Sequence, residues 1–143
     1  MSKKFIIGSD HAGYLLKNKL FDYLKEQGFE IVDAGTYSEE SCDYPVIARD
    51  VANKIVYGNY NFGILVCGTG VGMSIVANKV KGIRAAVVSD TCSAKLSRQH
   101  NNANILCIGS RIVGESLAKD IVDIWLTTDF EGERHQRRVS MIE

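Results

Sequence analysis

The sequence predicts an α/β fold, a three-layer α/β/α sandwich around a Rossmann-like, five-stranded parallel sheet in the order 2-1-3-4-5. Three observations support it. Five short apolar runs alternate with longer amphipathic stretches. The runs are almost continuously apolar, as strands buried on both faces of a parallel sheet must be. Right-handed crossovers then place helices on both sheet faces, and five strands suit the shorter doubly wound order.

The strands and helices are expected in strict alternation. The predicted strands cover residues 5–8, 30–33, 63–67, 84–88 and 104–108. After the first strand, Leu16, Leu20 and Leu24 step by four along one face of a helix that Gly28 would end. Pro45 suits the first turn of a second helix.

The later helices are shorter, except for the last. Helical patterns cover residues 71–79 and 91–98, and a final long helix carries Leu117, Ile121 and Ile124. A polar tail, residues 128–143, follows. We find no repeat or linker, so residues 1–143 are expected to form one domain, within the usual range of roughly 100–200 residues.

Composition excludes several classes of protein. Hydrophobic residues make up 45% and charged residues 24%, which is ordinary for a globular chain and disfavours disordered, collagen-like and coiled-coil classes. Lys plus Arg and Asp plus Glu both total 17. The net charge of zero argues against a general binder of nucleic acids or membrane surfaces, which would need a basic excess.

Cysteine usage and the N-terminal run indicate the compartment. The four cysteines show no C-x-x-C spacing, and no histidine pair has zinc-finger spacing. The run from Met1 to Ile7 is too short for a signal peptide, and no apolar stretch reaches about 18 residues. We therefore expect a cytoplasmic protein with reduced thiols and no bound metal.

The predicted topology locates the site. In open α/β sheets, ligands bind beyond the carboxyl ends of the strands, where the strand order reverses. Here that point lies between the first and third strands. The segments that follow these strands, residues 8–13 and 67–72, are rich in glycine and polar residues. The site is therefore expected between them.

The segment from Cys67 to Gly72 can form an anion hole. Its glycines allow successive backbone N–H groups to converge, and the helix that follows adds partial positive charge. Such a setting favours the thiolate form of Cys67. The competing interpretation is a small buried hydrophobic residue, the usual fate of a free cysteine. That interpretation is kept for the other three cysteines, Cys42, Cys92 and Cys107.

Three better-known loops almost match this segment. A dinucleotide fingerprint would need glycine at position 73, and a cysteine-phosphatase loop would need arginine there, but the residue is Met73. Asp90 does stand 20 residues after Gly70, as a ribose-binding acid would. A P-loop would need Gly-Lys-Ser/Thr after the glycines, and none is present.

Two further segments could contribute side chains to the predicted site. Asp10 and His11 follow the first strand, where a carboxylate beside an imidazole can move protons or hold hydroxyl and phosphate groups. The alternative is a turn aspartate and a surface histidine. Tyr44 stands at the start of the second helix, where it could equally be a packed side chain.

The remaining candidates lie in the second half of the chain. His100 and Asn101 offer an acid/base group and an amide to a sugar or an enediolate, and Arg111 follows the fifth strand. In the tail, Arg134 and Arg138 would share a helical face suited to phosphate. A solvated, charged C-terminus is the alternative for the tail.

Together these segments resemble the ribose-5-phosphate isomerase B family, which also includes galactose-6-phosphate isomerase subunits. The resemblance covers nearly the whole chain. It rests on six motifs in register, at residues 8–13, 43–45, 67–72, 97–101, 109–111 and 134–138. It implies an aldose–ketose isomerase for phosphorylated sugars that needs no metal or organic cofactor.

The resemblance also implies roles. Cys67 would be the base that moves a proton between C1 and C2, and His100 would help to open the sugar ring, with Asp10 and Thr69 nearby. The backbone of the glycine loop would stabilise the oxyanion. The implied substrate-binding positions are Asp10, His11, Tyr44, Gly68, Thr69, Gly70, Val71, Gly72, Asn101, Arg111, Arg134 and Arg138.

Family members are dimers or larger, with the active site between subunits, so the tail at 128–143 would reach a neighbouring subunit of a homodimer or dimer of dimers. The expected reaction interconverts D-ribose 5-phosphate and D-ribulose 5-phosphate through a cis-enediol(ate), a step of the pentose phosphate pathway. A six-carbon sugar phosphate, such as allose or galactose 6-phosphate, is one alternative substrate. A phosphosugar-binding module without catalysis is a second alternative.

Overall fold

The structure, a computed structural model, describes residues 3–143, so Met1 and Ser2 of the predicted domain and N-terminal run lie outside the described residues. Strands and helices alternate as predicted. They are β1 (Lys4–Ser9), α1 (Tyr14–Glu26), β2 (Glu30–Asp33), α2 (Tyr44–Tyr57), β3 (Phe62–Cys67), α3 (Val71–Ala77), β4 (Ala85–Val87), α4 (Thr91–Gln99), β5 (Ile105–Gly109), α5 (Glu115–Thr127) and α6 (Arg134–Val139). Helix α6 forms within the segment predicted as a polar tail.

All five strands are parallel, in the order β2-β1-β3-β5-β4. The predicted order 2-1-3-4-5 is therefore wrong for the last two strands. Strand β5 carries four fully buried side chains in a row, from Ile105 to Ile108. Strand β4 has only three residues, begins with two alanines and is partly exposed. The bulkier strand gains more by lying between two neighbours, so the short strand occupies the edge.

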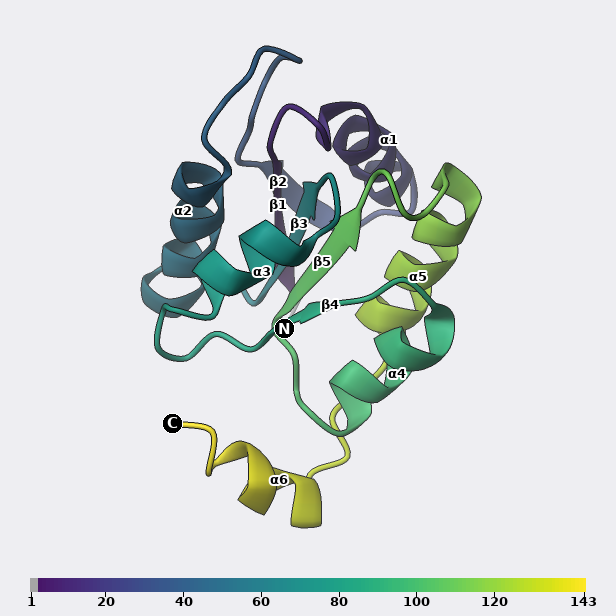
Figure 1. The fold of residues 1–143 in the computed structure, drawn as a ribbon. Helices are drawn as coiled ribbons and strands as arrows, with labels where there is room; N and C mark the ends of the chain where they lie inside the picture. Colours follow the sequence, from purple (N-terminus) through teal and green to yellow (C-terminus); the bar gives the residue numbers. More distant parts are fainter. Residues whose placement is uncertain (1–2) are drawn as a thin grey trace.

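Helices α1, α4 and α5 cover one face of the sheet, and α2 and α3 cover the other (Figure 1). The corrected order explains this division. Because the chain steps back from β4 to β5, a right-handed crossover carries α4 to the face opposite α3. The core of the first face includes Trp125 of α5, and that of the second includes Met73 of α3. Along the described residues, no helix combines the length and apolar character needed to cross a bilayer.

The loops after β1 and β3 are packed together as the topology predicted. The backbone N–H of Asp10 donates to the carbonyl oxygen of Val66, at 3.2 Å. A Cβ atom at Gly13 would lie 2.2 Å from that same oxygen. Glycine is therefore required for α1 to begin against the end of β3, and the close approach fixes the two loops relative to each other.

Candidate functional site

Cys67 lies at the carboxyl end of β3, at the edge of the glycine loop. Its side chain is buried, and its Sγ accepts a hydrogen bond from the backbone N–H of Gly70, at 3.1 Å. Gly70 has a φ of 82°, a left-handed conformation that glycine adopts without strain. The turn therefore directs a backbone N–H donor at the sulfur.

Of the other three cysteines, only Cys107 is the buried hydrophobic residue that was expected, and burial raises the pKa of its thiol. The expectation is wrong for Cys42, which is half-buried, and for Cys92, which is exposed. Cys92 stands in the first turn of α4 and Cys42 in the loop before α2, so neither is carried by a strand into the core.

Arg111 lies directly beside the glycine loop. Its backbone N–H donates to the carbonyl oxygen of Gly68, at 3.0 Å, and a Cβ atom at position 68 would lie 3.4 Å from its Nη1 atom. The backbone N–H of Ser110 also donates to the carbonyl oxygen of Cys67, at 2.8 Å. Because β5 neighbours β3, its end holds a guanidinium group over the loop that carries the thiol.

Tyr44 approaches the same loop from α2. A Cβ atom at Gly72 would lie 2.8 Å from Cε1 of the Tyr44 ring, and 40% of the Tyr44 surface remains exposed. Residues 43–45 also start the helix as the alternative interpretation expected, with Asp43 as the N-cap and Pro45 in the first turn. The ring thus packs on the loop while its outer part remains exposed.

Asp10 and His11 lie in the adjoining β1–α1 loop. Oδ1 of the buried Asp10 accepts the backbone N–H of Gly13, at 3.0 Å, so the turn contact of the alternative interpretation is present. Nδ1 of His11 accepts the backbone N–H of Cys42, at 3.2 Å. In the neutral ring the proton is therefore on Nε2, which can donate to an anionic or hydroxyl oxygen.

Asp90 stands at the spacing expected of a ribose-binding acid, but in the structure it caps a helix. It is the N-cap of α4, and its Oδ1 accepts the backbone N–H of Ser93, at 2.6 Å. That hydrogen bond lowers the pKa of Asp90 below its ordinary value. The segment after β4 is therefore an ordinary helix start.

The second group of predicted residues lies beyond the amino ends of the strands, at the end of the sheet opposite to Cys67. His100 ends α4 and precedes β5, whereas Cys67 ends β3. Since Gly63 pairs with Ile105 and Cys67 with Gly109, the two edges are four residue steps, or about 13 Å, apart. The resemblance implied that His100 lies near Asp10 and Thr69. Within one chain the structure does not bring these residues together.

The C-terminal helix α6 lies at this end of the sheet, near the segment that leads from α4 into β5 (Figure 1), and its His135 stacks on His100. His100, Asn101 and Arg138 line a shared pocket of about 400 Å³. Arg134 lies one helical turn before Arg138, and both side chains are exposed. The predicted site is thus divided into two half-sites: a thiol half-site around Cys67 and a histidine half-site around His100.

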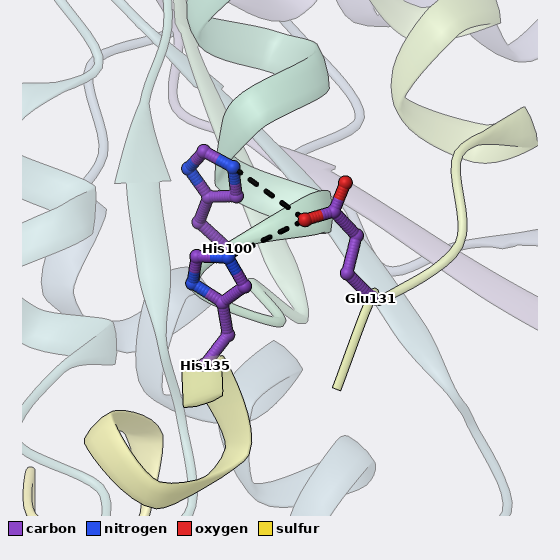
Figure 2. Close-up of side chains that lie close together, drawn as sticks. All are labelled: His100, Glu131 and His135. Carbon is purple, nitrogen blue, oxygen red and sulfur yellow. Dashed lines mark ion pairs between the residues drawn. The ribbon is translucent and has the colours of Figure 1, made fainter. Parts of the chain in front are cut away.

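Two residues to which the sequence interpretation gave no role, Glu131 and His135, adjoin His100 (Figure 2). The two imidazole rings are stacked, with centroids 4.2 Å apart and planes 9° from parallel. Burial lowers the pKa of His135, nearby cationic groups add to this effect, and Glu131 opposes it. The four-residue spacing of Glu131 and His135 could have indicated that these two side chains lie close together. It could not have shown that the His100 ring stacks on His135.

Taken together, the fold and the thiol half-site define a class of protein. It is an α/β domain that brings a buried thiol, a glycine loop and the Arg111 guanidinium together at the carboxyl ends of the central strands, an arrangement suited to a small anionic ligand.

Comparison with known proteins makes this class specific. The sequence model of the Ribose/Galactose Isomerase family matches residues 5–142, so the chain belongs to that family. Ribose-5-phosphate isomerase B of Escherichia coli (strain K12) is 54% identical over 140 residues, which cover 98% of this chain and 94% of that protein.

Solved structures agree. Ribose-5-phosphate isomerase B of Clostridium thermocellum has a TM-score of 0.96 and 52% identity, covering 97% of this chain and 94% of that one. The enzyme of Mycoplasma genitalium, solved with bound ribulose-5-phosphate, has a TM-score of 0.94 and 47% identity, covering 99% of this chain and 95% of that one. The α/β/α fold is therefore shared with these relatives over nearly its whole length.

Proposed function

We propose that this chain is an aldose–ketose isomerase that interconverts D-ribose 5-phosphate and D-ribulose 5-phosphate, a step of the pentose phosphate pathway in the cytoplasm. The observation that carries the proposal is the contact between the Cys67 Sγ and the Gly70 N–H, in a glycine loop flanked by Arg111. A relative with 47% identity was solved with ribulose-5-phosphate bound, which supports this choice of substrate.

The chemistry needs a base and a stabilised oxyanion. The Cys67 thiolate takes the proton from C2 of the open aldose, the electron pair forms the C1–C2 double bond, and O1 becomes the enediolate oxygen. Cys67 then returns the proton to C1, while the proton of O2–H passes to O1, so that C2 becomes the carbonyl carbon and O1 a hydroxyl group. This exchange balances without an oxidant or reductant, and we propose that it uses neither a metal nor an organic cofactor. Losing one oxyanion donor typically costs about 10²–10³ in rate.

The proposed site is completed by a second copy of the chain. The two half-sites lie about 13 Å apart along the strands of one chain, too far for one five-carbon substrate to reach both. A neighbour that places its histidine half-site over the thiol half-site would bring the groups together. Exposed apolar side chains close to the glycine loop and Arg111 would supply contact area for a homodimer or a dimer of dimers: Val71, Ile75 and Ile112.

In this arrangement the tail at 128–143 reaches the neighbouring subunit. His100 of one chain would open the furanose ring beside Asp10 and Thr69 of the other. Its neighbour Asn101 would contact the enediolate. We assign the substrate and its phosphate to the remaining polar groups of both half-sites: His11, Tyr44, Arg111, Arg134 and Arg138.

An isomerase assay of the purified protein tests the proposal. Ribose 5-phosphate, allose 6-phosphate and galactose 6-phosphate should be compared, with and without EDTA. We expect turnover of ribose 5-phosphate that EDTA does not reduce. Turnover confined to a six-carbon substrate would establish that alternative instead. Binding without turnover of any of the three would establish a binding module and overturn the enzyme.

A further inference from the structure

Three ligand-type side chains meet where α6 packs against the end of α4: His100, Glu131 and His135 (Figure 2). We call them the His–Glu–His cluster. Glu131 Oε1 lies 3.7 Å from Nε2 of His100 and 3.3 Å from Nε2 of His135. One donor atom from each residue lies within 4.8 Å of the other two. Among residues 3–143, this is the one such group of three.

A second observation points to a ligand. Nε2 of His135 is buried and makes no hydrogen bond in the described part of the chain; its 3.3 Å contact with Oε1 of Glu131 is an ion pair only when the ring is protonated. A buried polar nitrogen without a partner is costly and rare in proteins. A cation bound between His135 and Glu131 would satisfy that nitrogen.

The distances suit a borderline divalent cation with nitrogen and oxygen ligands. Zinc–nitrogen and zinc–oxygen bonds of about 2.0–2.2 Å in a tetrahedron place neighbouring ligand atoms about 3.3–3.5 Å apart. The two distances from Glu131, 3.3 and 3.7 Å, are close to this value. Because the stacked rings are nearly parallel, one ring must rotate for both nitrogen lone pairs to converge. His100 can do so, since 37% of its side chain is exposed.

We propose that the His–Glu–His cluster binds Zn²⁺ and that the bound ion inhibits the enzyme. Three protein ligands leave a fourth position open to water. Zinc at this place withdraws the His100 imidazole from acid–base work, because the coordinated nitrogen can no longer carry a proton. Zinc binding itself is independent of the isomerase activity, whereas the inhibition rests on the proposed function.

Isothermal titration calorimetry with ZnCl₂ tests the site on the full chain, kept reduced with a phosphine. We expect Glu131→Gln and His135→Asn each to weaken zinc binding at least about 10-fold. Even replacing a residue that only hydrogen-bonds to a metal ligand typically costs about 10-fold or more in metal affinity. Cys92→Ser removes an exposed thiol on α4 and is the matched control, so it should bind zinc as the wild type does. Glu131 is exposed, and its variant remains decisive if His135→Asn fails to fold.

The activity assay then separates the two proposals. Zinc should inhibit the wild type and Cys92→Ser, excess EDTA should restore activity, and Glu131→Gln should keep its activity in zinc. The proposed zinc site is overturned if both cluster variants bind zinc as tightly as the wild type. It is also overturned if zinc affinity is lost only when a cysteine is replaced. If the wild type shows no isomerase activity at all, the proposed function fails, while the calorimetry still decides whether the cluster binds zinc.

Discussion

Replacing Arg98 by methionine should destabilise the fold by a measurable amount, because this buried side chain joins three segments. Its Nη1 donates to the carbonyl oxygen of Ala103, at 2.6 Å, and to Oδ1 of Asn102, at 3.1 Å. Its Nε donates to the carbonyl oxygen of Thr128, at 3.2 Å. Arg98 therefore ties the segment after His100 to the start of the C-terminal tail, the two parts that form the histidine half-site.

The magnitude follows from these contacts. A hydrogen bond from a charged donor contributes about 1.5–3 kcal/mol, so three such bonds give an upper range of about 4.5–9 kcal/mol. Only the bond to Ala103 is fully buried. Burial also lowers the pKa of Arg98, so removing the charge recovers part of a desolvation cost. Methionine keeps apolar bulk beside Phe62 but loses the guanidinium that lies 4.7 Å from the centroid of that ring. We expect a loss of about 3 kcal/mol, or about 6–12 °C in melting temperature.

Urea unfolding followed by circular dichroism measures this loss. Lys95→Met on the same helix is the matched control, since Lys95 is exposed and its replacement should change stability by no more than about 0.5 kcal/mol. A loss below about 1 kcal/mol in Arg98→Met, or equal losses in the two variants, would refute the reasoning that Arg98 ties these segments together.

Three further predictions concern the thiol half-site, the loop packing and the pH dependence of stability. Cys67→Ala should reduce kcat by at least about 10²-fold while leaving phosphosugar affinity nearly unchanged, and retained turnover would show that another group is the base. Gly13→Ala should lower the urea midpoint sharply, because the new Cβ would lie 2.2 Å from a carbonyl oxygen of β3; an unchanged midpoint would contradict that packing. Hydrogen bonds from Lys19 and Lys119 lower the pKa of Glu115, so its contribution is present above its ordinary pKa and lost as the pH falls through the lowered value. Glu115→Gln should therefore lose stability at pH 7 but little at pH 3, and equal losses at both pH values would contradict the assignment.

Most of the fold could be predicted from local sequence, because apolar runs and four-residue steps report directly on strands and helices. The order of the last two strands could not, since a doubly wound rule fixes only the usual arrangement. The relevant signal was side-chain volume: large residues from Ile105 to Ile108 require two neighbours, whereas Ala85 and Ala86 tolerate an edge. Volume along a strand is therefore informative where topology rules leave a choice.

The two half-sites show a similar limit. Residues that follow strands, such as Cys67 and Arg111, could be placed at one edge of the sheet from the topology alone. The same rule places His100 at the other edge, because it precedes β5. Family resemblance groups all these residues into one site between subunits and assigns the tail to the neighbouring chain, but it does not say that His100 comes from that chain as well. The stacking of His100 on His135 depends on the path of the tail after α5, which no local periodicity encodes.

The central claim is that each active site uses the thiol half-site of one chain and the histidine half-site of another. Mixing two inactive variants, Cys67→Ala and His100→Asn, tests it most directly after the chains are unfolded and refolded together. In a two-fold dimer, half of the random pairs are mixed and each regains one intact site, so about a quarter of wild-type activity should return. A mixture as inactive as its two parents, although mass spectrometry shows mixed dimers, would contradict a site shared between chains.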